Sequence, residues 1–162
     1  MSERIKLLVV DDEVKFLDAI ARRLELRDFD VTKATNGPEA IEAARHKKFD
    51  IAILDLKMPG MNGREVLEIL KSQHKFLEVI ILTGHGSLDS AVECTKLGAF
   101  SYLPKPYELD ELIKVVRDAF EHRLKKKFEH DQQRLEELMR RAVGESPLSI
   151  LRRMAELDDE EK

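Results

Sequence analysis

The sequence IKLLVVDDE at residues 5–13 decides the fold class, because it joins a largely apolar run, Ile5–Val10, to three consecutive acidic residues. Apolar runs this short are typical of strands that are buried on both faces, as in parallel sheets. Four further runs of the same kind follow, at Phe29–Val31, Ile51–Leu54, Val79–Leu82 and Phe100–Leu103. The sequence therefore predicts a parallel sheet of five strands.

Helical periodicity separates these predicted strands, because apolar residues recur there at spacings of three and four. The helices are expected around Phe16–Leu24, Ala40–Ala44, Val66–Leu70, Ala91–Thr95 and Leu109–Phe120. Alternating strands and helices predict a doubly wound α/β domain with right-handed crossovers. In such a domain the ligand lies beyond the carboxyl ends of the strands, so the chemistry is expected at that edge.

The charge of the chain is unevenly distributed. Of its 162 residues, 37% are charged, and the net charge is −4. Residues 123–162 carry ten basic and ten acidic side chains, so the negative excess lies in residues 1–122. An acidic balance argues against a general nucleic-acid binder, which needs basic side chains for the phosphate backbone. We therefore expect a compact acidic domain at 1–122, followed by a highly charged helical segment.

The cysteine count and the first residues bear on location. The single cysteine, Cys94, excludes an internal disulfide and favours a reducing compartment, so a cytoplasmic location is predicted. The start of the chain combines a short apolar run with acidic residues, which indicates neither a signal peptide nor a membrane span. The expected partners are therefore neither membranes nor nucleic acids.

Polar side chains stand where four of the predicted strands end. They are Asp11 and Asp12 after the first strand, Asp55 after the third, Thr83 at the end of the fourth and Lys105 after the fifth. Because the carboxyl ends of parallel strands share one edge, these side chains are expected to converge. Crowded carboxylates repel one another, and Mg²⁺ relieves this by accepting oxygen ligands. A carboxylate can attack phosphorus while cations and hydroxyl donors stabilise the phosphoryl oxygens, so the pattern predicts a phosphoryl-transfer site.

Two enzyme classes fit this pattern less well. The segment Gly84-His85-Gly86 does not complete GxGxxG, because position 89 is Asp, and the chain contains no GxxxxGK[ST] motif. A phosphatase of the haloacid-dehalogenase type needs Asp-x-Asp after a strand, which neither 11–13 nor 55–57 provides. We therefore interpret the glycine-rich segment as a loop that serves Thr83.

The chain resembles the receiver domain of two-component response regulators over residues 4–122. The segments that carry the resemblance are LLVVDDE at 7–13, DIAILDLKMPGMNG at 50–63 and VIILTGHGSLDSAVECTKLGAFSYLPKP at 79–106. The resemblance implies a flavodoxin-like (βα)5 fold with strand order 2-1-3-4-5 and an extended C-terminal helix. It also implies a phosphoacceptor that switches conformation, rather than a conventional enzyme.

The resemblance further implies a role for each acidic residue. Asp55 would accept a phosphoryl group from a phosphohistidine of a sensor histidine kinase. Asp12 and Asp55 would bind Mg²⁺ directly, and Asp11 would help through water. The backbone carbonyl of Lys57 would be the third protein ligand of the metal.

The remaining implied roles concern the switch. Thr83 and Lys105 would contact the phosphoryl oxygens. Tyr102 matches the aromatic switch position, which turns inward as Thr83 moves towards the phosphoryl group. The family usually holds the peptide before Pro106 in cis. Phosphorylation would thus shift a two-state equilibrium that an output partner reads.

The last predicted helix continues beyond Phe120. Apolar residues recur at heptad-like spacing, with a polar break at Asp131; they are Leu124, Phe128, Leu135, Leu138 and Ala142. The seam is short for a coiled coil, and a solvated single helix is the alternative, but the apolar stripe favours a homodimer. We therefore expect a helical extension at 123–143 that can form a dimerisation coiled coil, and a short helix with an acidic tail at 144–162.

The segment AVGESPLSILRRMAEL at 142–157 is similar to the start of the ATPase module in bacterial enhancer-binding transcription activators. AFSYLPKP at 99–106 and the loop after Thr83 also suit receivers of that family. Neither an ATP-binding loop nor a helix-turn-helix follows, so we expect a stand-alone receiver or a trimmed activator. Two alternatives stay open: a phosphorelay intermediate that passes the group to a histidine phosphotransfer protein, and a fragment or degenerate relative of such an activator.

Overall fold

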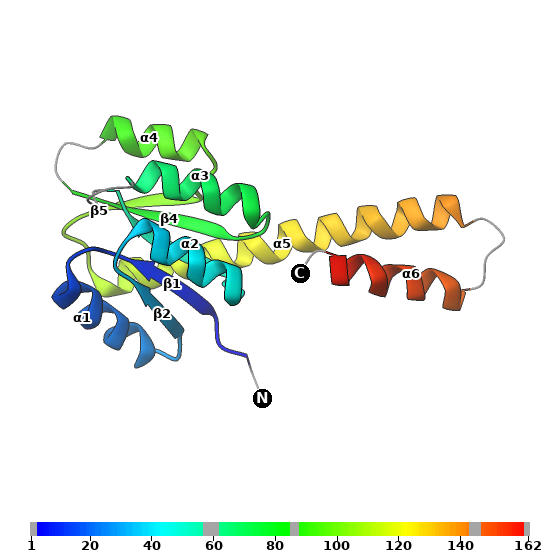
Figure 1. Ribbon diagram of the computed structural model, residues 1–162, viewed down its shortest axis with the longest axis horizontal. Helices are drawn as coiled ribbons and strands as arrows, with labels where there is room; N and C mark the ends of the chain where they lie inside the picture. Colours follow the sequence, from blue (N-terminus) through cyan, green and yellow to red (C-terminus); the bar gives the residue numbers. More distant parts are fainter. Residues whose placement is uncertain (1–2, 57–61, 85–87, 143–146, 161–162) are drawn as a thin grey trace. The chain divides into compact units, whose positions relative to one another are not determined.

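The computed structural model describes residues 3–56, 62–84, 88–142 and 147–160 (Figure 1). In chain order its elements are β1 (Lys6–Val10), α1 (Val14–Glu25), β2 (Asp30–Ala34), α2 (Gly37–His46), β3 (Ile51–Asp55), α3 (Gly63–Gln73), β4 (Glu78–Thr83), α4 (Leu88–Lys96), β5 (Ser101–Pro104), α5 (Leu109–Arg141) and α6 (Pro147–Glu160). The chain divides into two compact units, Met1–Arg123 and Leu124–Lys162. Strands and helices alternate through the first unit, as the sequence predicts.

The first unit is built on one parallel sheet with strand order β2-β1-β3-β4-β5. The register places Leu8 of β1 opposite Thr32 of β2 on one side and Ala52 of β3 on the other. β2 and β3 therefore lie on opposite sides of β1. The chain adds β2 on one side of β1 and then β3, β4 and β5 on the other side. The predicted doubly wound fold and strand order are confirmed.

Two layers of helices cover the sheet, and side chains of each strand alternate between them. Leu8 and Val10 of β1 belong to the cluster that contains buried residues of α2, α3 and α4, including the fully buried Cys94. Leu7 and Val9 belong to the cluster formed with α1 and the first part of α5. Burial on both faces explains why the central strands are continuously apolar in sequence.

Local hydrogen bonds and one close approach fix the start of α3. The Asn62 side chain accepts a hydrogen bond from the backbone N–H of Glu65 at 3.0 Å, which caps the helix. Gly63 packs against the end of β3: a Cβ added there would lie 2.7 Å from Leu56 Cα and 2.8 Å from Asp55 O. Glycine is therefore required for α3 to start this close to the strand that carries Asp55.

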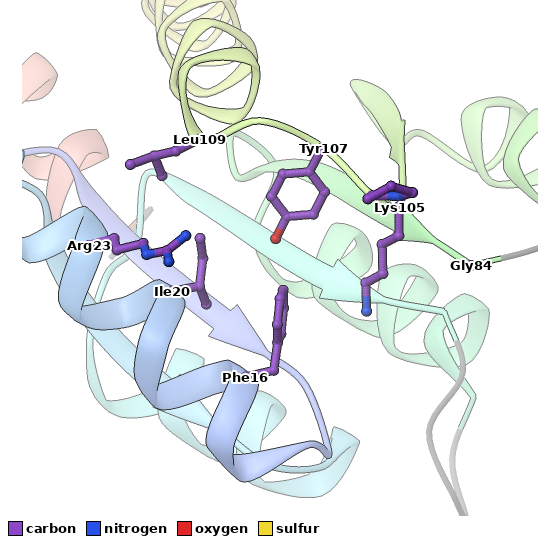
Figure 2. Close-up of a pocket in the computed structure, with 8 residues that line it drawn as sticks. Phe16, Ile20, Arg23, Gly84, Lys105, Tyr107 and Leu109 are labelled. Atoms are coloured by element: carbon purple, nitrogen blue, oxygen red, sulfur yellow. The ribbon is translucent and has the colours of Figure 1, made fainter.

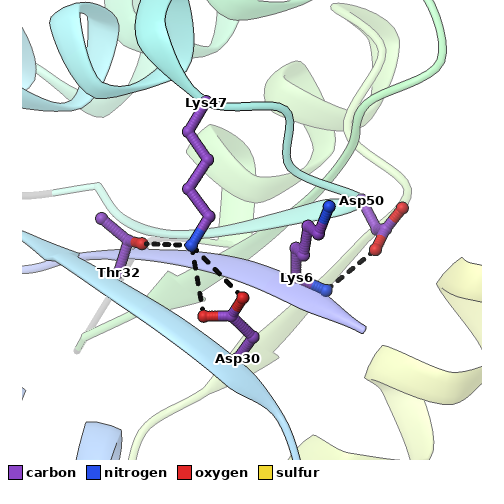
Figure 3. Close-up of polar contacts among 5 residues, drawn as sticks. All are labelled: Lys6, Asp30, Thr32, Lys47 and Asp50. Carbon is purple, nitrogen blue, oxygen red and sulfur yellow. Dashed lines mark hydrogen bonds and ion pairs between the residues drawn. The ribbon is translucent and has the colours of Figure 1, made fainter. Parts of the chain in front are cut away.

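Ion pairs mark the edge strand and the amino end of the sheet. The Lys47 ammonium donates to both carboxylate oxygens of Asp30, at 3.2 and 3.3 Å, and contacts Thr32 on the edge strand β2 (Figure 3). Charged side chains on an edge strand disfavour pairing with other chains. At the amino end, Asp50 accepts from the backbone N–H of Lys6 at 2.8 Å (Figure 3) and from Arg123 Nε at 3.1 Å. These contacts join β1, β3 and α5.

The second unit contains the end of α5 and all of α6. Leu138 of α5 and Ala142, directly after its end, are buried, and Arg134 pairs with Asp158 of α6 at 3.3 Å. Leu124 and Phe128 are 51% and 62% exposed. Part of the predicted heptad seam is thus buried within the single chain. α6 extends to Glu160, so residues 158–160 are helical. Among the described helices, none combines the length and apolarity that a membrane span requires.

Candidate functional site

The carboxyl end of β1 places two of the predicted acidic residues. The backbone N–H of Asp11 donates to Ala34 O of β2 at 3.1 Å, which extends the sheet ladder by one residue. Asp11 Oδ1 accepts the backbone N–H of Glu13 at 2.9 Å, in the turn that leads into α1. Asp11 is 1% exposed, whereas Asp12 is half-buried. The turn therefore holds one carboxylate inside the site and the next at its mouth.

Asp55 is the last residue of β3 and brings a third carboxylate to the same edge. One carboxylate oxygen of each of Asp11, Asp12 and Asp55 lies within 4.8 Å of the others. Asp55 is 6% exposed. The predicted convergence of these three residues is therefore present in the structure.

Lys105 provides the positive charge at this edge. Its ammonium lies 3.4 Å from Asp55 Oδ2 and 3.6 Å from Asp11 Oδ2. Lys105 follows β5 and forms a cis peptide bond with Pro106. One ammonium thus faces two carboxylates, and with Asp12 the group retains a net negative charge.

The buried charges shift the pKa of two groups. Burial raises the pKa of Asp11, and the nearby Asp55 charge adds to this, while the Glu13 N–H and Lys105 oppose it. Burial also raises the pKa of Tyr107 to about 12, with smaller contributions from the negative charges of Asp11 and Asp55. The phenol is therefore neutral at physiological pH.

The donor set fits a hard divalent cation. Asp11 Oδ2 is buried and has no hydrogen-bond partner among the described residues, although it lies beside two other carboxylates. A buried carboxylate oxygen without a hydrogen bond is costly unless a cation compensates it. Mg²⁺ is bound by one or two carboxylates together with water and phosphate oxygens. Asp11, Asp12 and Asp55 are the described residues that would hold it.

Three of the predicted site residues are not seen within the cluster: two lie wholly or partly outside the described residues, and one is at the surface. Thr83 ends β4, but its side chain lies outside the described residues, as does the whole of Lys57. The side chain of Tyr102, on β5, is 36% exposed and so is not packed into the core. The structure therefore brings Asp11, Asp12, Asp55 and Lys105 together and leaves Tyr102 at the surface.

Two aromatic residues next to the site were not predicted from the sequence. The Lys105 ammonium lies over the Phe16 ring, 4.9 Å from its centroid, and Phe16 meets Tyr107 edge to face at 6.5 Å. Both rings line a cavity of about 420 Å³ between α1 and the start of α5, together with Ile20, Arg23 and Leu109 (Figure 2). The sequence pattern predicts only that Phe16 is a core-facing residue of α1. Its contact with Lys105 depends on how α1 packs beside the end of β5.

Comparison with known proteins agrees with this geometry. A family model described as the response regulator receiver domain matches residues 7–117. The chain belongs to this family. The receiver fold accounts for the whole sheet and for the position of the acidic residues at its carboxyl edge.

The relatives of this receiver include transcriptional regulators. The DNA-binding transcriptional regulator NtrC of Escherichia coli (strain K12) is 40% identical over 114 residues, which are 70% of this chain and 24% of that protein. The transcriptional regulatory protein ZraR of Klebsiella oxytoca is 36% identical over 120 residues, covering 74% of this chain and 27% of that protein. The chain spans about a quarter of the length of these curated relatives. The predicted similarity to receivers of enhancer-binding activators is confirmed.

Solved structures show the same fold. A receiver domain from Clostridium thermocellum has a TM-score of 0.71 and 36% identity, over 76% of this chain and 97% of that one. NtrX from Brucella abortus in complex with ADP has a TM-score of 0.76 and 28% identity, over 86% of this chain and 34% of that one.

Proposed function

We propose that Asp55 is the phosphoacceptor of this receiver and that a sensor histidine kinase is its phosphodonor. The observation that carries the proposal is the cluster of Asp11, Asp12 and Asp55 within 4.8 Å, with Lys105 3.4 Å from Asp55. Of the three carboxylates, only that of Asp55 lies at the end of the central strand β3, between β1, which leads to Asp11 and Asp12, and β4, which ends in Thr83.

The proposed reaction is a phosphoryl transfer to a carboxylate. An Asp55 oxygen attacks the phosphorus of a phosphohistidine, forming an acyl phosphate as the P–N bond breaks. The electron pair of that bond stays on the imidazole nitrogen of the donor. The products are the neutral histidine, once it has gained a proton, and phosphorylated Asp55.

The surrounding side chains stabilise the charge of the transferring group. The Lys105 ammonium is close enough to Asp55 to donate a hydrogen bond to a phosphoryl oxygen after a small movement. Thr83, which ends the neighbouring strand β4, would donate its hydroxyl to another oxygen. When bound by Asp11, Asp12, Asp55 and the Lys57 carbonyl, Mg²⁺ would neutralise phosphoryl charge.

We further propose that phosphorylation is read out through Tyr102. Its ring is exposed on β5, next to β4, whose last residue is Thr83. Movement of Thr83 towards the phosphoryl group would leave space for the ring to turn inward. The face that an output partner recognises would then change, which is a population shift between two states. We propose that this exchange takes place in the cytoplasm, in keeping with the reducing compartment that the single cysteine favours.

The direct test is labelling with acetyl phosphate. Asp55→Asn is expected to abolish Mg²⁺-dependent phosphorylation, because the amide keeps the shape of the side chain but is not a nucleophile. Intact-mass spectrometry before and after hydroxylamine treatment measures the acyl phosphate. Asp12→Asn is the matched change, and it should slow labelling and raise the Mg²⁺ requirement without removing the acceptor. Labelling of Asp55→Asn at the wild-type rate would contradict the assignment.

We also propose that the chain forms a homodimer through α5 beyond residue 123. Leu124 and Phe128 are 51% and 62% exposed, and they lie four residues apart, on one face of the helix. Replacing both by serine is expected to convert a dimer to a monomer in light scattering. The matched control replaces Leu148 and Leu151 of α6, which are 63% and 61% exposed, by serine. This control variant should remain a dimer. An unchanged oligomeric state in the first variant would refute the proposal.

A further inference from the structure

The aromatic residues beside Lys105 have no role in the reaction proposed above. Lysine has a long, flexible side chain, so holding its ammonium at one point has an entropic cost. Its distances of 3.4 and 3.6 Å to the two carboxylates exceed the roughly 2.7–2.9 Å of a tight charge-assisted hydrogen bond. The carboxylates attract the ammonium, but these contacts do not fix it. A further contact would therefore help to hold the ammonium in place.

The Phe16 ring is in the right place to do so. The ammonium lies over the ring at 4.9 Å from the centroid, within the range of about 6 Å in which a cation is attracted to an aromatic face. The Lys105 side chain is 27% exposed, so the contact is partly shielded from water. The ring therefore attracts the ammonium while leaving its N–H groups available to oxygen atoms, which a third carboxylate would not do.

Phe16 is held in turn by its neighbours. Its ring meets Tyr107 at an interplanar angle of 83°, the edge-to-face arrangement that aromatic pairs prefer. Tyr107 is two residues after Lys105, beyond the cis peptide, so the same corner of the chain carries both the ammonium and the second ring (Figure 2). Phe16, Lys105 and Tyr107 thus form one packed unit between α1 and the β5–α5 connection.

We propose that Phe16 is a positioning residue for phosphoryl transfer, whose ring face holds the Lys105 ammonium between Asp11 and Asp55. The proposal rests on the phosphoacceptor function of Asp55. Phe16 touches no reacting atom and acts through Lys105. In its absence the ammonium samples more positions, and fewer molecules have it ready when the phosphoryl oxygens arrive.

Phe16→Leu tests the proposal in the full chain, because leucine keeps an apolar side chain but has no aromatic face. We expect the rate of labelling by acetyl phosphate at saturating Mg²⁺ to fall about threefold to tenfold. Phe16→Trp should be labelled at about the wild-type rate. Indole binds cations more strongly than a phenyl ring does, and the adjacent cavity of about 420 Å³ has room for it. Phe120→Leu is the matched control, as Phe120 packs against the same core cluster from α5. It should label at the wild-type rate.

Two further measurements separate positioning from a structural effect. A loosened Lys105 repels a cation less, so Mg²⁺ should bind Phe16→Leu as tightly as the wild type or more tightly, whereas a disordered site would bind it less well. The ε-methylene protons of Lys105 should be shifted upfield by the ring in wild-type NMR spectra, and this shift should disappear in Phe16→Leu.

Each outcome bears on one proposal. Unshifted ε-methylene protons in the wild type, or a Phe16→Leu rate equal to wild type, would overturn the role of Phe16. Equal slowing in Phe16→Leu and Phe16→Trp would also overturn it, because the face of the ring would then not matter. Wild-type protein that shows the ring shift but is not labelled on Asp55 would instead refute the phosphoacceptor assignment.

Discussion

The two ends of the parallel sheet carry buried charges in opposite arrangements. At the amino end, the Asp50 carboxylate accepts hydrogen bonds from the Lys6 N–H at 2.8 Å and from Arg123 Nε at 3.1 Å. At the carboxyl end, three carboxylates cluster, the Lys105 ammonium faces two of them, and Asp11 Oδ2 has no hydrogen bond among the described residues. The Asp50 charge is thus paired within the protein, whereas the carboxylate cluster keeps an excess of negative charge that a cation would offset.

This difference separates stability from function within one domain. A charge pair that is satisfied internally fixes elements against each other, and removing one partner leaves a costly buried charge. A cluster with excess like charge lowers stability and creates a demand for a ligand. Substitutions at the amino end should therefore affect unfolding alone, and those at the carboxyl end should also affect Mg²⁺ binding.

The largest expected effect is at the amino end. Arg123→Ala removes the contact with Asp50 and the 2.7 Å hydrogen bond to Phe76 O, both in a partly buried setting. We expect the free energy of unfolding to fall by about 3 kcal/mol, since Asp50 loses its cation. Urea denaturation measures this loss, and Mg²⁺ affinity should stay unchanged.

Arg27→Ala is the matched control for this change. Arg27 pairs with Asp110 at 3.4 Å, but the two side chains are 50% and 84% exposed. An exposed pair contributes little, so the loss should stay below about 0.5 kcal/mol. Equal losses in the two variants would show that burial does not distinguish the pairs, and the contrast between the two ends would fail.

A smaller loss is expected beneath the carboxyl end. Gly63→Ala places a Cβ 2.7 Å from Leu56 Cα and 2.8 Å from Asp55 O, and these backbone atoms cannot rotate away. We expect a loss of about 2 kcal/mol in the free energy of unfolding, together with slower labelling of Asp55. Gly84→Ala is the control for stability, because its Cβ would meet no atom of the described residues within 4 Å. A Gly63→Ala variant with wild-type stability would contradict the close approach.

The two ends of the sheet differ in how far the sequence predicts them, because one depends on local patterns and the other on contacts between distant residues. Asp11, Asp12 and Asp55 each follow a recognisable apolar run, and parallel topology alone brings such strand ends together. The pairs at the amino end join residues far apart in the chain, such as Asp50 and Arg123. No local pattern marks them, because they depend on how α5 crosses the sheet.

The same limit applies to side chains whose contacts depend on a neighbouring element. Phe16 has the spacing of an ordinary core residue of α1, and its contact with Lys105 follows from the packing of α1 beside the β5–α5 connection. Leu138 and Ala142 continue the heptad pattern of α5, yet both are buried in the unit that α5 forms with α6. Periodicity predicts that a face is apolar, but it does not identify what covers that face.

The smallest expected effect is a gain in stability at the carboxyl end. Burial raises the pKa of Asp11, so the folded protein binds this proton more tightly than the unfolded chain does. The ionised carboxylate therefore lowers stability above its folded-state pKa. Asp11→Asn should raise the free energy of unfolding by about 1 kcal/mol at pH 7 without divalent cations. The gain should shrink as pH falls through the raised pKa towards the ordinary value of 3.8.

Magnesium should reverse the order of the two proteins in this last comparison. A ligand that binds only the folded state stabilises it, and at about ten times its Kd the gain is roughly 1.4 kcal/mol. The wild type should gain this amount, and Asp11→Asn should gain less because it has lost one carboxylate of the cluster. Thermal unfolding at pH 7 with and without Mg²⁺ measures both effects. If Asp11→Asn is less stable than the wild type without Mg²⁺, the excess charge is not costly, and the carboxyl end does not depend on a cation for its balance.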